Sequence, residues 1–381
     1  MPIKVAHVVR QYYPSVGGME DVVQNIARQQ VARHGQLPRI LTLDRVFTHA
    51  DARLPPQEQV NDIPVVRLPY WGSSRYPVCP SVLQHVHDAD VIHVHGIDFF
   101  YDYLAAAWPL HRRPMVASTH GGFFHTQFAS TFKKIYFNTV TRVSSRAYTR
   151  VIATSHNDGD IFSSIVKPPK LTVIENGVNV EKYNGKSASQ LTPTLIYFGR
   201  WSENKGLLET IAFFKMLVSR QSEWKLIIAG REYDHTQGSL TTELKKHALT
   251  GQVQLVPNPT DQQLTDLIGQ ANYFICLSRH EGFGIAPIEA MSAGLTPVLS
   301  DIPPFRNLIE QSGLGLPINA GAEMGVAALL ALHEQGPYAY AHRREMAKTF
   351  AARYSWQHIA DQYADIYAGL AGQTLRKARC A

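Results

Sequence analysis

Residues 194–206 read TLIYFGRWSENKG, an apolar run followed by a glycine and a polar loop that ends in a second glycine. A short run rich in β-branched and aromatic residues is typical of a buried strand, and the loop leads into a helix. A similar opening occurs near the N-terminus, where residues 3–20 read IKVAHVVRQYYPSVGGME. Two such strand–loop–helix openings predict two doubly wound α/β domains.

Strands and helices alternate on both sides of residues 180–193, a polar stretch that we interpret as a linker. Before it, strands are expected at 3–9, 39–43, 91–94, 115–118, 151–154 and 171–174, and helices at 19–33 and 98–111. After it, strands are expected at 194–198, 225–229, 253–256, 273–277 and 297–300, with helices near 207–218, 241–247, 262–268, 287–292 and 356–370. Ligands of such sheets bind at the carboxyl ends of the strands, so we expect a site in a cleft between the domains.

The composition is that of a folded protein. The 381 residues are 45% hydrophobic and 18% charged, enough to build a core in each of two domains. Cys79, Cys276 and Cys380 are odd in number and far apart, which argues against a disulfide framework or a zinc site. No uncharged run is apolar enough to span a bilayer, and the N-terminus lacks the pattern of a signal peptide. We therefore expect a cytoplasmic protein.

All of the excess positive charge lies in the first half of the chain. Residues 1–190 hold 20 basic and 14 acidic side chains, whereas residues 191–381 hold 17 of each. No Asp or Glu occurs between Asp102 and Asp158. The net charge of +6 implies an anionic partner, which could be nucleic acid, anionic lipid or a phosphorylated substrate.

Two loops at the carboxyl ends of predicted strands have the chemistry of anion sites. Gly17 and Gly18 precede the first helix, so backbone amides can approach an anion there, although a plain turn would look the same. Arg200 and Lys205 follow the strand at 194–198. A forked guanidinium and a compact ammonium suit a diphosphate, and the alternative is two solvated surface cations.

Residues 278–291, SRHEGFGIAPIEAM, place two carboxylates around a glycine-rich loop. Pro287 is expected at the first position of a helix, which makes the loop before it an anion site and puts Glu289 near the third position. There Glu289 could simply cap the helix. Glu281 would repel a phosphate unless it faces hydroxyl groups, so the pair suggests a nucleotide sugar.

Several histidines and acids need a decision between catalysis, metal binding and structure. His120 follows a predicted strand and precedes a glycine pair, a position that favours a functional role as much as a structural one. His93 and His95 alternate along a strand, and we interpret them as a half-buried strand pattern, not as a metal pair. Asp88 and Asp90 form an Asp-x-Asp sequence, but they precede a strand, so we do not assign a metal to them.

One predicted helical stripe in the first domain combines aromatic and basic side chains. Its phenylalanines and Ile135 are followed by arginines in four-residue steps, with no acid nearby, which suits an anionic bilayer or a lipid diphosphate. The alternative is a helix packed on its own domain with its arginines in water. A nucleic-acid surface is not favoured, because no recognised binding module is present. The predicted membrane or acceptor face comprises Phe124, Phe128, Phe132, Lys133, Lys134, Arg142, Arg146 and Arg150.

Together these residues resemble the retaining GT-B glycosyltransferases of the glycosyltransferase family 4 type, over essentially the whole chain. The markers are Gly17-Gly18-Met19-Glu20, His120-Gly121, the sequence IENGV at 174–178, Gly199-Arg200 with Lys205-Gly206, and Glu281-x7-Glu289. Asn179 departs from the pattern, since the family usually has Asp there. The resemblance implies two Rossmann-like domains facing a central cleft. Residues 1–185 with 356–381 would form the acceptor and membrane-facing domain, residues 190–355 the donor domain, and the last helix would cross back to the first domain.

The resemblance also implies roles for single residues. Arg200 and Lys205 would neutralise the leaving nucleoside diphosphate in place of a metal, so no metal or other cofactor is expected. Glu281 would bind sugar hydroxyls, Glu289 would hold the ribose diol, and His120 would face the donor sugar. The expected catalytic residues are His120, Arg200, Lys205 and Glu281. The expected donor-binding residues are Gly17, Gly18, Gly199, Gly282, Phe283, Gly284, Ile285 and Glu289.

Within the family, the chain looks most like the α-mannosyltransferases that extend polyprenyl-diphosphate-linked cellobiose in xanthan- and acetan-type exopolysaccharide assembly. This likeness implies α-1,3 transfer of mannose from GDP-mannose to a lipid-linked oligosaccharide by a peripheral protein on the cytoplasmic face of the inner membrane. UDP-glucose and UDP-N-acetylglucosamine remain alternative donors. A phosphorylase, a nucleotide-sugar epimerase and a non-catalytic sugar-nucleotide or lipid-binding subunit remain alternative functions.

Overall fold

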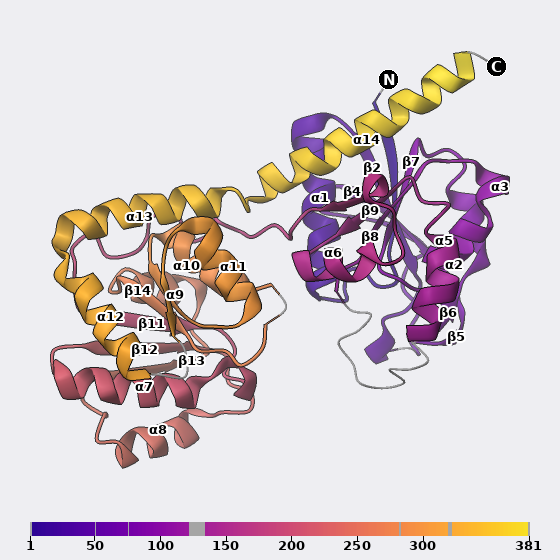
Figure 1. Ribbon diagram of the computed structural model, residues 1–381. Coiled ribbons are helices and arrows are strands. Elements are labelled where there is room, and N and C mark those ends of the chain that lie inside the picture. Colours follow the sequence, from indigo (N-terminus) through magenta and orange to yellow (C-terminus); the bar gives the residue numbers. More distant parts are fainter. Residues whose placement is uncertain are drawn as a thin grey trace. The chain divides into compact units, whose positions relative to one another are not determined.

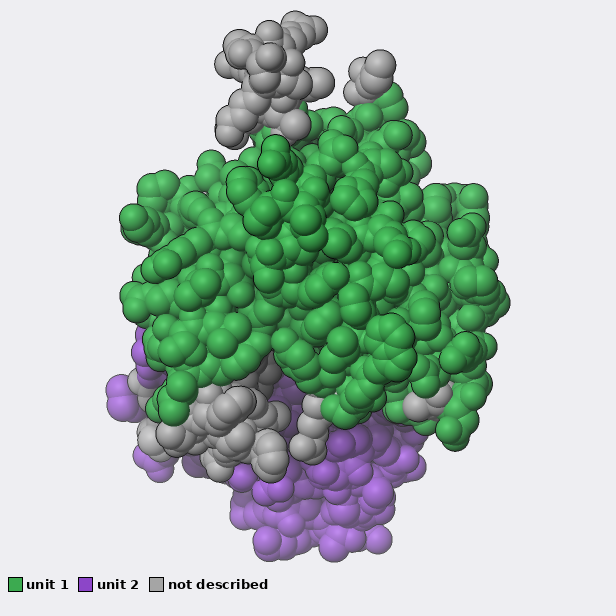
Figure 2. Space-filling view, turned by 90° about the vertical axis from the view of Figure 1, so that its right-hand side faces the viewer, with its two compact units in different colours: residues 1–177, 356–381 green, residues 178–355 purple. Residues whose placement is uncertain are grey.

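The computed structural model describes residues 2–49, 51–74, 76–121, 134–281, 283–318 and 322–379 (Figure 1). The chain forms two compact units, which are coloured separately in Figure 2. Unit 1 comprises Met1–Gly177 and Trp356–Ala381, and unit 2 comprises Val178–Ser355.

Unit 1 is built on an eight-stranded sheet with the strand order β10-β9-β8-β7-β1-β2-β4-β3. All neighbouring strands are parallel except β3 and β4, which form an antiparallel pair at one edge. The central strands are buried on both faces, which is why their sequences are mostly apolar, although β1 and β7 also carry the buried histidines His7, His93 and His95. The strands of unit 1, including the separate β5–β6 ribbon, are β1 (Lys4–Val8), β2 (Leu37–Leu43), β3 (Gln57–Val60), β4 (Ile63–Leu68), β5 (Trp71–Ser73), β6 (Tyr76–Val78), β7 (Val91–His95), β8 (Met115–Ser118), β9 (Arg150–Ala153) and β10 (Leu171–Val173).

The last helix belongs to unit 1, as the resemblance implied. Tyr363 and Tyr367 of this helix are buried in one core cluster with Ile26 of α1 and with strand residues of the sheet. The helix expected at 98–111 is divided at Ala107, because α3 begins anew with Trp108 and a proline in its first turn. The α-helices in the described part of unit 1 are α1 (Gly18–His34), α2 (Phe99–Ala106), α3 (Trp108–His111), α5 (Arg142–Ser144), α6 (His156–Ser163) and α14 (Trp356–Arg379).

Unit 2 has a six-stranded, fully parallel sheet with the order β13-β12-β11-β14-β15-β16. Its strands are β11 (Thr194–Phe198), β12 (Lys225–Gly230), β13 (Val253–Pro257), β14 (Tyr273–Cys276), β15 (Thr296–Ser300) and β16 (Leu316–Ile318). Among its described residues, the α-helices are α7 (Leu207–Arg220), α8 (Gln237–Lys246), α9 (Asp261–Ile268), α10 (Ile285–Ala293), α11 (Pro303–Ser312), α12 (Ala322–Glu334) and α13 (Gly336–Ala352). Two parallel α/β units confirm the predicted fold class.

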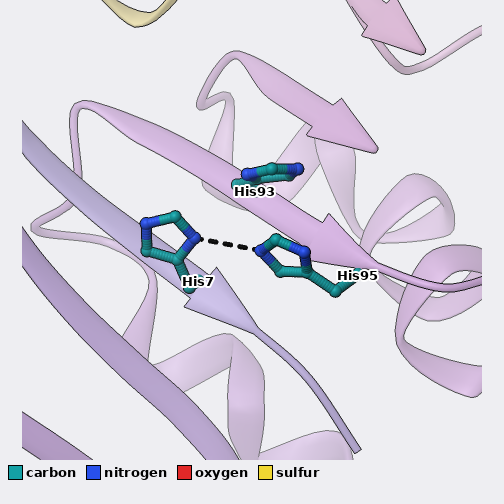
Figure 3. Close-up of side chains that lie close together, drawn as sticks. All are labelled: His7, His93 and His95. Atoms are coloured by element: carbon teal, nitrogen blue, oxygen red, sulfur yellow. Dashed lines mark hydrogen bonds between the residues drawn. The ribbon is translucent and has the colours of Figure 1, made fainter. Parts of the chain in front are cut away.

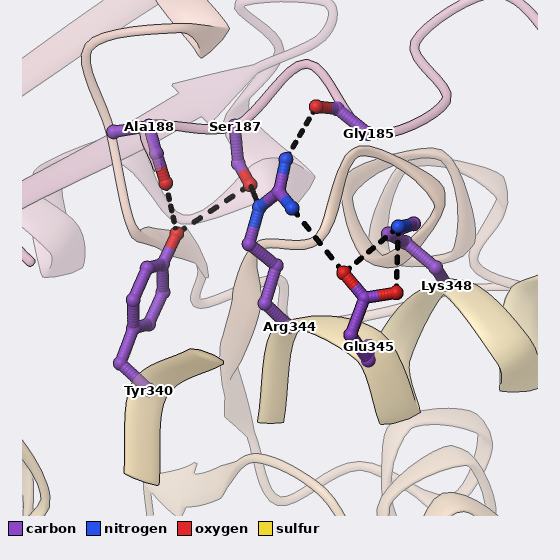
Figure 4. A network of polar contacts seen from close by, with 7 residues as sticks. All are labelled: Gly185, Ser187, Ala188, Tyr340, Arg344, Glu345 and Lys348. Atoms are coloured by element: carbon purple, nitrogen blue, oxygen red, sulfur yellow. Dashed lines mark hydrogen bonds and ion pairs between the residues drawn. The ribbon is translucent and has the colours of Figure 1, made fainter. Parts of the chain in front are cut away.

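The boundary between the units lies earlier than the expected position at 185, because Val178, Val180 and Tyr183 are buried in the core of unit 2. Side chains of helix α13 also form hydrogen bonds to the segment that follows Tyr183. Arg344 donates to the backbone oxygen of Gly185, and the Tyr340 hydroxyl donates to the backbone oxygen of Ala188 (Figure 4). The polar stretch at 180–193 is therefore part of unit 2, held by side chains of a helix about 150 residues away in sequence.

Candidate active site

A pocket of about 440 Å³ lies at the carboxyl ends of β11 and β14 in unit 2. Parallel strands bring the loops at their carboxyl ends together at one edge of the sheet, so segments 76 residues apart meet there. The structure thus gathers most of the predicted donor-site residues of the second half. Those that line the pocket are Gly199, Arg200, Lys205, Glu281, Phe283, Gly284, Ile285 and Glu289. Gly282 lies outside the described residues.

Lys205 and Glu281 form an ion pair inside this pocket. The Lys205 Nζ atom lies 2.5 Å from Glu281 Oε1, and the Ser278 hydroxyl donates to the same oxygen at 2.9 Å. The Glu281 side chain is only 11% exposed and that of Lys205 24%. Two donors on one carboxylate oxygen fix Glu281 in place, and the pair puts a positive and a negative group side by side in the pocket.

Arg200 reaches the pocket from the loop after β11. Its guanidinium carbon lies 5.2 Å from the ring centroid of Tyr233, within the range of a cation–π contact. The Tyr197 hydroxyl donates to the Arg200 backbone oxygen at 2.7 Å and so holds the loop. Sequence reasoning missed Tyr233, which lies in the loop after β12, and only its place after a predicted strand could have indicated it.

Helix α10 begins earlier than the sequence indicated. Gly284 precedes it with φ 91°, a left-handed conformation that glycine adopts readily, and the helix starts at Ile285. Pro287 is therefore its third residue and Glu289 its fifth, so the expected first and third positions were wrong. A proline in the first turn is tolerated because the first amides of a helix have no partner within it. The capping role considered for Glu289 is thereby removed.

Glu289 is a half-buried carboxyl group on the wall of the pocket. Burial raises the pKa of Glu289 to about 7, against the smaller lowering effect of Lys182. A raised pKa means that the folded protein binds a proton more tightly than the unfolded chain does. Folding stability attributable to this group therefore falls as the pH rises from about 4.5 to about 7.

We expect Glu289→Gln to be more stable than the wild type at pH 8, by about 1–3 kcal/mol, and to lose this advantage at pH 4. An amide has the shape of the protonated carboxyl and cannot ionise. Urea unfolding of both proteins at the two pH values measures the difference. Glu334→Gln, on the exposed part of α12, is the control. Parallel pH dependence of Glu289→Gln and the wild type would contradict the assigned pKa.

The predicted glycine loop of unit 1 lies at the start of α1. Gly17 precedes this helix in an extended conformation, and a Cβ atom there would approach Glu20 Oε2 to 2.6 Å. Ser15 donates to the other oxygen of the same carboxylate at 3.0 Å. A Cβ on Gly18 would meet open space. The loop therefore has its own carboxylate packed against Gly17, while Gly18 remains open to approach.

His120 lies two residues after the end of β8, with φ 51°, and its ring contacts a second histidine. Its Nε2 atom is 2.9 Å from Nδ1 of His95 on the neighbouring strand β7. Burial lowers the pKa of His120 to about 4, so the imidazole is neutral near pH 7. The structure places His120 at the same sheet edge as the carboxyl ends of β1 and β7.

Sequence reasoning missed an ion pair at this edge of the sheet in unit 1. Arg10 Nε lies 3.1 Å from Asp98 Oδ2, and the Asp98 side chain is 5% exposed. Burial raises the pKa of Asp98 to about 6 in spite of Arg10. Both residues follow predicted strands, as His120 does, so their positions in the sequence carried the signal.

The predicted basic face is only partly one surface. Arg142 lies in α5 and Arg146 in the turn after it, and both line a pocket of about 590 Å³ together with Lys167 and Lys170. Arg150 does not continue the helical stripe, because it begins strand β9 and donates to the Pro169 backbone oxygen. That part of the prediction was wrong: the helix ends after Ser144 and the chain turns into the sheet.

Lys134 and Ile135 are exposed at the start of the described part of this face. The predicted residues Phe124, Phe128, Phe132 and Lys133 lie outside the described residues. Among the helices that the structure describes, none has the length and the apolar character needed to cross a membrane.

Solved structures of other proteins share this fold. A glycosyltransferase of Rickettsia africae superposes with a TM-score of 0.73 at 16% identity, covering 97% of this chain and 98% of its own. Anabaena HepE, solved in complex with UDP and glucose, superposes with a TM-score of 0.64 at 18% identity, covering 96% of this chain and 100% of its own. The fold is that of a GT-B glycosyltransferase.

Sequence comparisons show which glycosyltransferases this chain is similar to. Residues 16–182 match Glycosyltransferase Family 4, and residues 180–351 match Glycosyl transferases group 1. A GDP-mannose:cellobiosyl-diphosphopolyprenol alpha-mannosyltransferase of Xanthomonas campestris is 52% identical over 366 residues, 96% of each chain. A protein of the same name from Komagataeibacter xylinus is 40% identical over 384 residues, which is 100% of this chain and 96% of its own. The chain therefore belongs to the family of glycosyltransferases that includes these mannosyltransferases. It is a hexosyltransferase, as the resemblance implied.

Proposed function

We propose that the chain transfers mannose from GDP-mannose to polyprenyl-diphosphate-linked cellobiose, with retention and an α-1,3 linkage, in exopolysaccharide assembly. The observation that carries the proposal is the pocket of unit 2, which combines Lys205, Glu281, Arg200 and Glu289 next to the start of α10. The names of these relatives supply the sugar, the base and the acceptor of the proposal.

The charges in the pocket suit the departure of a nucleoside diphosphate. Sugar transfer builds positive charge on the anomeric carbon and negative charge on the leaving phosphate. Lys205, Arg200 and the first amides of α10 would stabilise that negative charge without a metal ion. Glu281, fixed by Lys205 and Ser278, would accept hydrogen bonds from sugar hydroxyls. Glu289 would accept from the ribose diol.

The acceptor is a lipid, so the protein must work at a membrane surface. Arg142 and Arg146, beside Lys167 and Lys170, offer a basic pocket on unit 1 for an anionic headgroup or the lipid diphosphate. Exposed Lys134 and Ile135 lie on the same segment as Arg142. We therefore propose a peripheral location on the cytoplasmic face of the inner membrane.

A transfer assay tests the proposed function. Purified protein is supplied with radiolabelled GDP-mannose, UDP-glucose or UDP-N-acetylglucosamine and with cellobiosyl-diphosphopolyprenol in vesicles containing anionic lipid, in EDTA. We expect label from GDP-mannose alone, and lower turnover in neutral vesicles. Transfer from a UDP-sugar would replace the donor, and activity restored only by Mg²⁺ would overturn the metal-independent reaction. Tight nucleotide binding without turnover would instead support a non-catalytic subunit.

A further inference from the structure

A line of hydrogen-bonded side chains lies behind His120 in the core of unit 1. His120 Nε2 is 2.9 Å from His95 Nδ1, and His95 Nε2 is 3.0 Å from His7 Nδ1. His7 Nε2 is 2.7 Å from Oε1 of Gln30, whose amide nitrogen donates to Gln36 Oε1 at 3.0 Å. We call these five residues the histidine line. Figure 3 shows His7 and His95 pointing toward each other from strands β1 and β7.

The histidine line is uncharged near pH 7, and it is buried except at its His120 end, where the residue is half-buried. His7, His95 and Gln30 have no exposed surface, and Gln36 is 5% exposed. Burial lowers the pKa of His7 to about 4 and that of His95 well below its ordinary value. A neutral imidazole has one nitrogen that donates and one that accepts. Each histidine in the line is therefore asymmetric, and its neighbours decide which nitrogen carries the proton.

The two glutamines at the end of the histidine line determine which nitrogen of each histidine donates and which accepts. Because Gln30 donates through its amide nitrogen to Gln36, its carbonyl oxygen faces His7 and must accept a hydrogen bond from it. His7 thus carries its proton on Nε2 and accepts at Nδ1. His95 must then carry its proton on Nε2, and the same step places the proton of His120 on Nε2. The lone pair of His120 is left on Nδ1.

Ring nitrogens of His7, His93 and His95 also lie within 4.8 Å of one another, close enough for one metal ion to bind all three. Their nitrogens are, however, already engaged by neutral partners. His93 Nδ1 is 2.7 Å from the Tyr367 hydroxyl, and His93 Nε2 is 2.8 Å from Ser118 Oγ. A metal would have to break these contacts and the His7–His95 bond, so the cluster is better explained as a hydrogen-bonding arrangement.

We propose that the histidine line holds His120 as the Nε2–H tautomer, so that its Nδ1 atom accepts a hydrogen bond from a sugar hydroxyl instead of donating one to a phosphate. Its four other members are positioning residues that act through His120. The nature of the group that meets Nδ1 rests on the proposed function. The tautomer itself rests only on the contacts within unit 1.

The tautomers can be measured without any substrate. In protein labelled with ¹⁵N-histidine, long-range ¹H–¹⁵N correlation spectra distinguish a protonated ring nitrogen from an unprotonated one. Single His→Gln variants assign the signals. We expect His7, His95 and His120 all to carry the proton on Nε2 at pH 7. Protons on Nδ1 in the three rings would mean that both glutamine amides are turned over and would overturn the proposal, as would a bound metal on His7 and His95.

Two variants of Gln36 test whether the glutamines determine the tautomer of His120. Gln36→Glu offers only acceptor oxygens, so it should keep the three Nε2–H tautomers and the turnover that depends on them. Gln36→Lys offers only donors, so the Gln30 amide must turn and the three protons move to Nδ1. We expect kcat to fall about 10²-fold in Gln36→Lys, with KM for the donor changed much less. Thermal unfolding controls for loss of structure.

The outcomes separate the two proposals. If Gln36→Lys loses turnover while the three tautomers stay unchanged, or shifts them without losing turnover, the line does not position His120 for the reaction. If Gln36→Lys does not fold, the spectrum of the wild type still decides the tautomer of His120. If the wild type transfers no mannose, the proposed function fails, while the spectra still test the histidine line.

Discussion

Lys205→Met is expected to reduce kcat by about 10²–10³-fold, which corresponds to about 2.7–4 kcal/mol of transition-state stabilisation. The ammonium group lies in the pocket at 2.5 Å from Glu281. Without it, the departing diphosphate loses a placed positive charge. The variant also leaves the Glu281 carboxylate, which is only 11% exposed, without its cation and close to the phosphate. Both effects raise the barrier, and steady-state kinetics with the lipid acceptor measure the sum.

Three further variants separate the two effects. Lys205→Met combined with Glu281→Gln removes the unpaired carboxylate, so any recovery of kcat reports repulsion by Glu281. Lys205→Arg keeps the positive charge and should retain more activity than Lys205→Met. Arg279→Met removes a nearby cation that is 56% exposed and pairs with Glu209 at 2.5 Å, and it should change kcat less than about twofold. Near-normal turnover of Lys205→Met would exclude Lys205 from the site.

Gly206→Ala is expected to lower the free energy of unfolding by about 2–5 kcal/mol. Gly206 precedes α7 and has φ 67°, which costs a residue with a Cβ atom about 1–2 kcal/mol. Its Cβ would also lie 1.9 Å from the backbone oxygen of Leu277, at the carboxyl end of β14. The backbone of one wall of the pocket would have to move, so activity should fall together with stability.

Gly313→Ala is the matched control for this prediction. Gly313 has φ 66°, nearly the same as Gly206, but a Cβ there would meet open space. It should cost about 1–2 kcal/mol, from the backbone conformation alone. Urea unfolding followed by the fluorescence of Trp201 and Trp224, both buried in unit 2, compares the two variants. Equal losses would mean that the approach of Gly206 to Leu277 is not a tight packing constraint.

The repeating pattern of strands and helices predicted the fold class because it depends only on local sequence. Apolar runs such as 194–198 and 225–229 encode buried parallel strands, and both are present as β11 and β12. The predicted boundaries of the domains and of single helices were less accurate. Residues 178–185 look polar on average, yet Val178, Val180 and Tyr183 are buried in unit 2, so their contacts decided the boundary. The helix at Arg142 ended early because the chain had to enter β9.

The candidate site was predictable where residues follow strands. The rule that ligands bind at the carboxyl ends of parallel strands placed Arg200, Lys205 and Glu281 at the binding edge of a sheet, and the structure gathers them in one pocket. The ion pair between Lys205 and Glu281 was not predicted, because a strand pattern does not give the order of strands in the sheet. For the same reason His95 was interpreted as a strand residue, although its neighbours in space are His7 and His120.

Helix α14 has a consequence for how the protein is made. Unit 1 begins at the N-terminus, but it is completed only by Trp356–Arg379, whose Tyr363 and Tyr367 fill its core. During synthesis on the ribosome, the first 177 residues therefore emerge without the helix that covers α1 and the sheet. Unit 2 is continuous in sequence and can fold as soon as it has left the ribosome. The part of the protein translated first is thus the last to be finished.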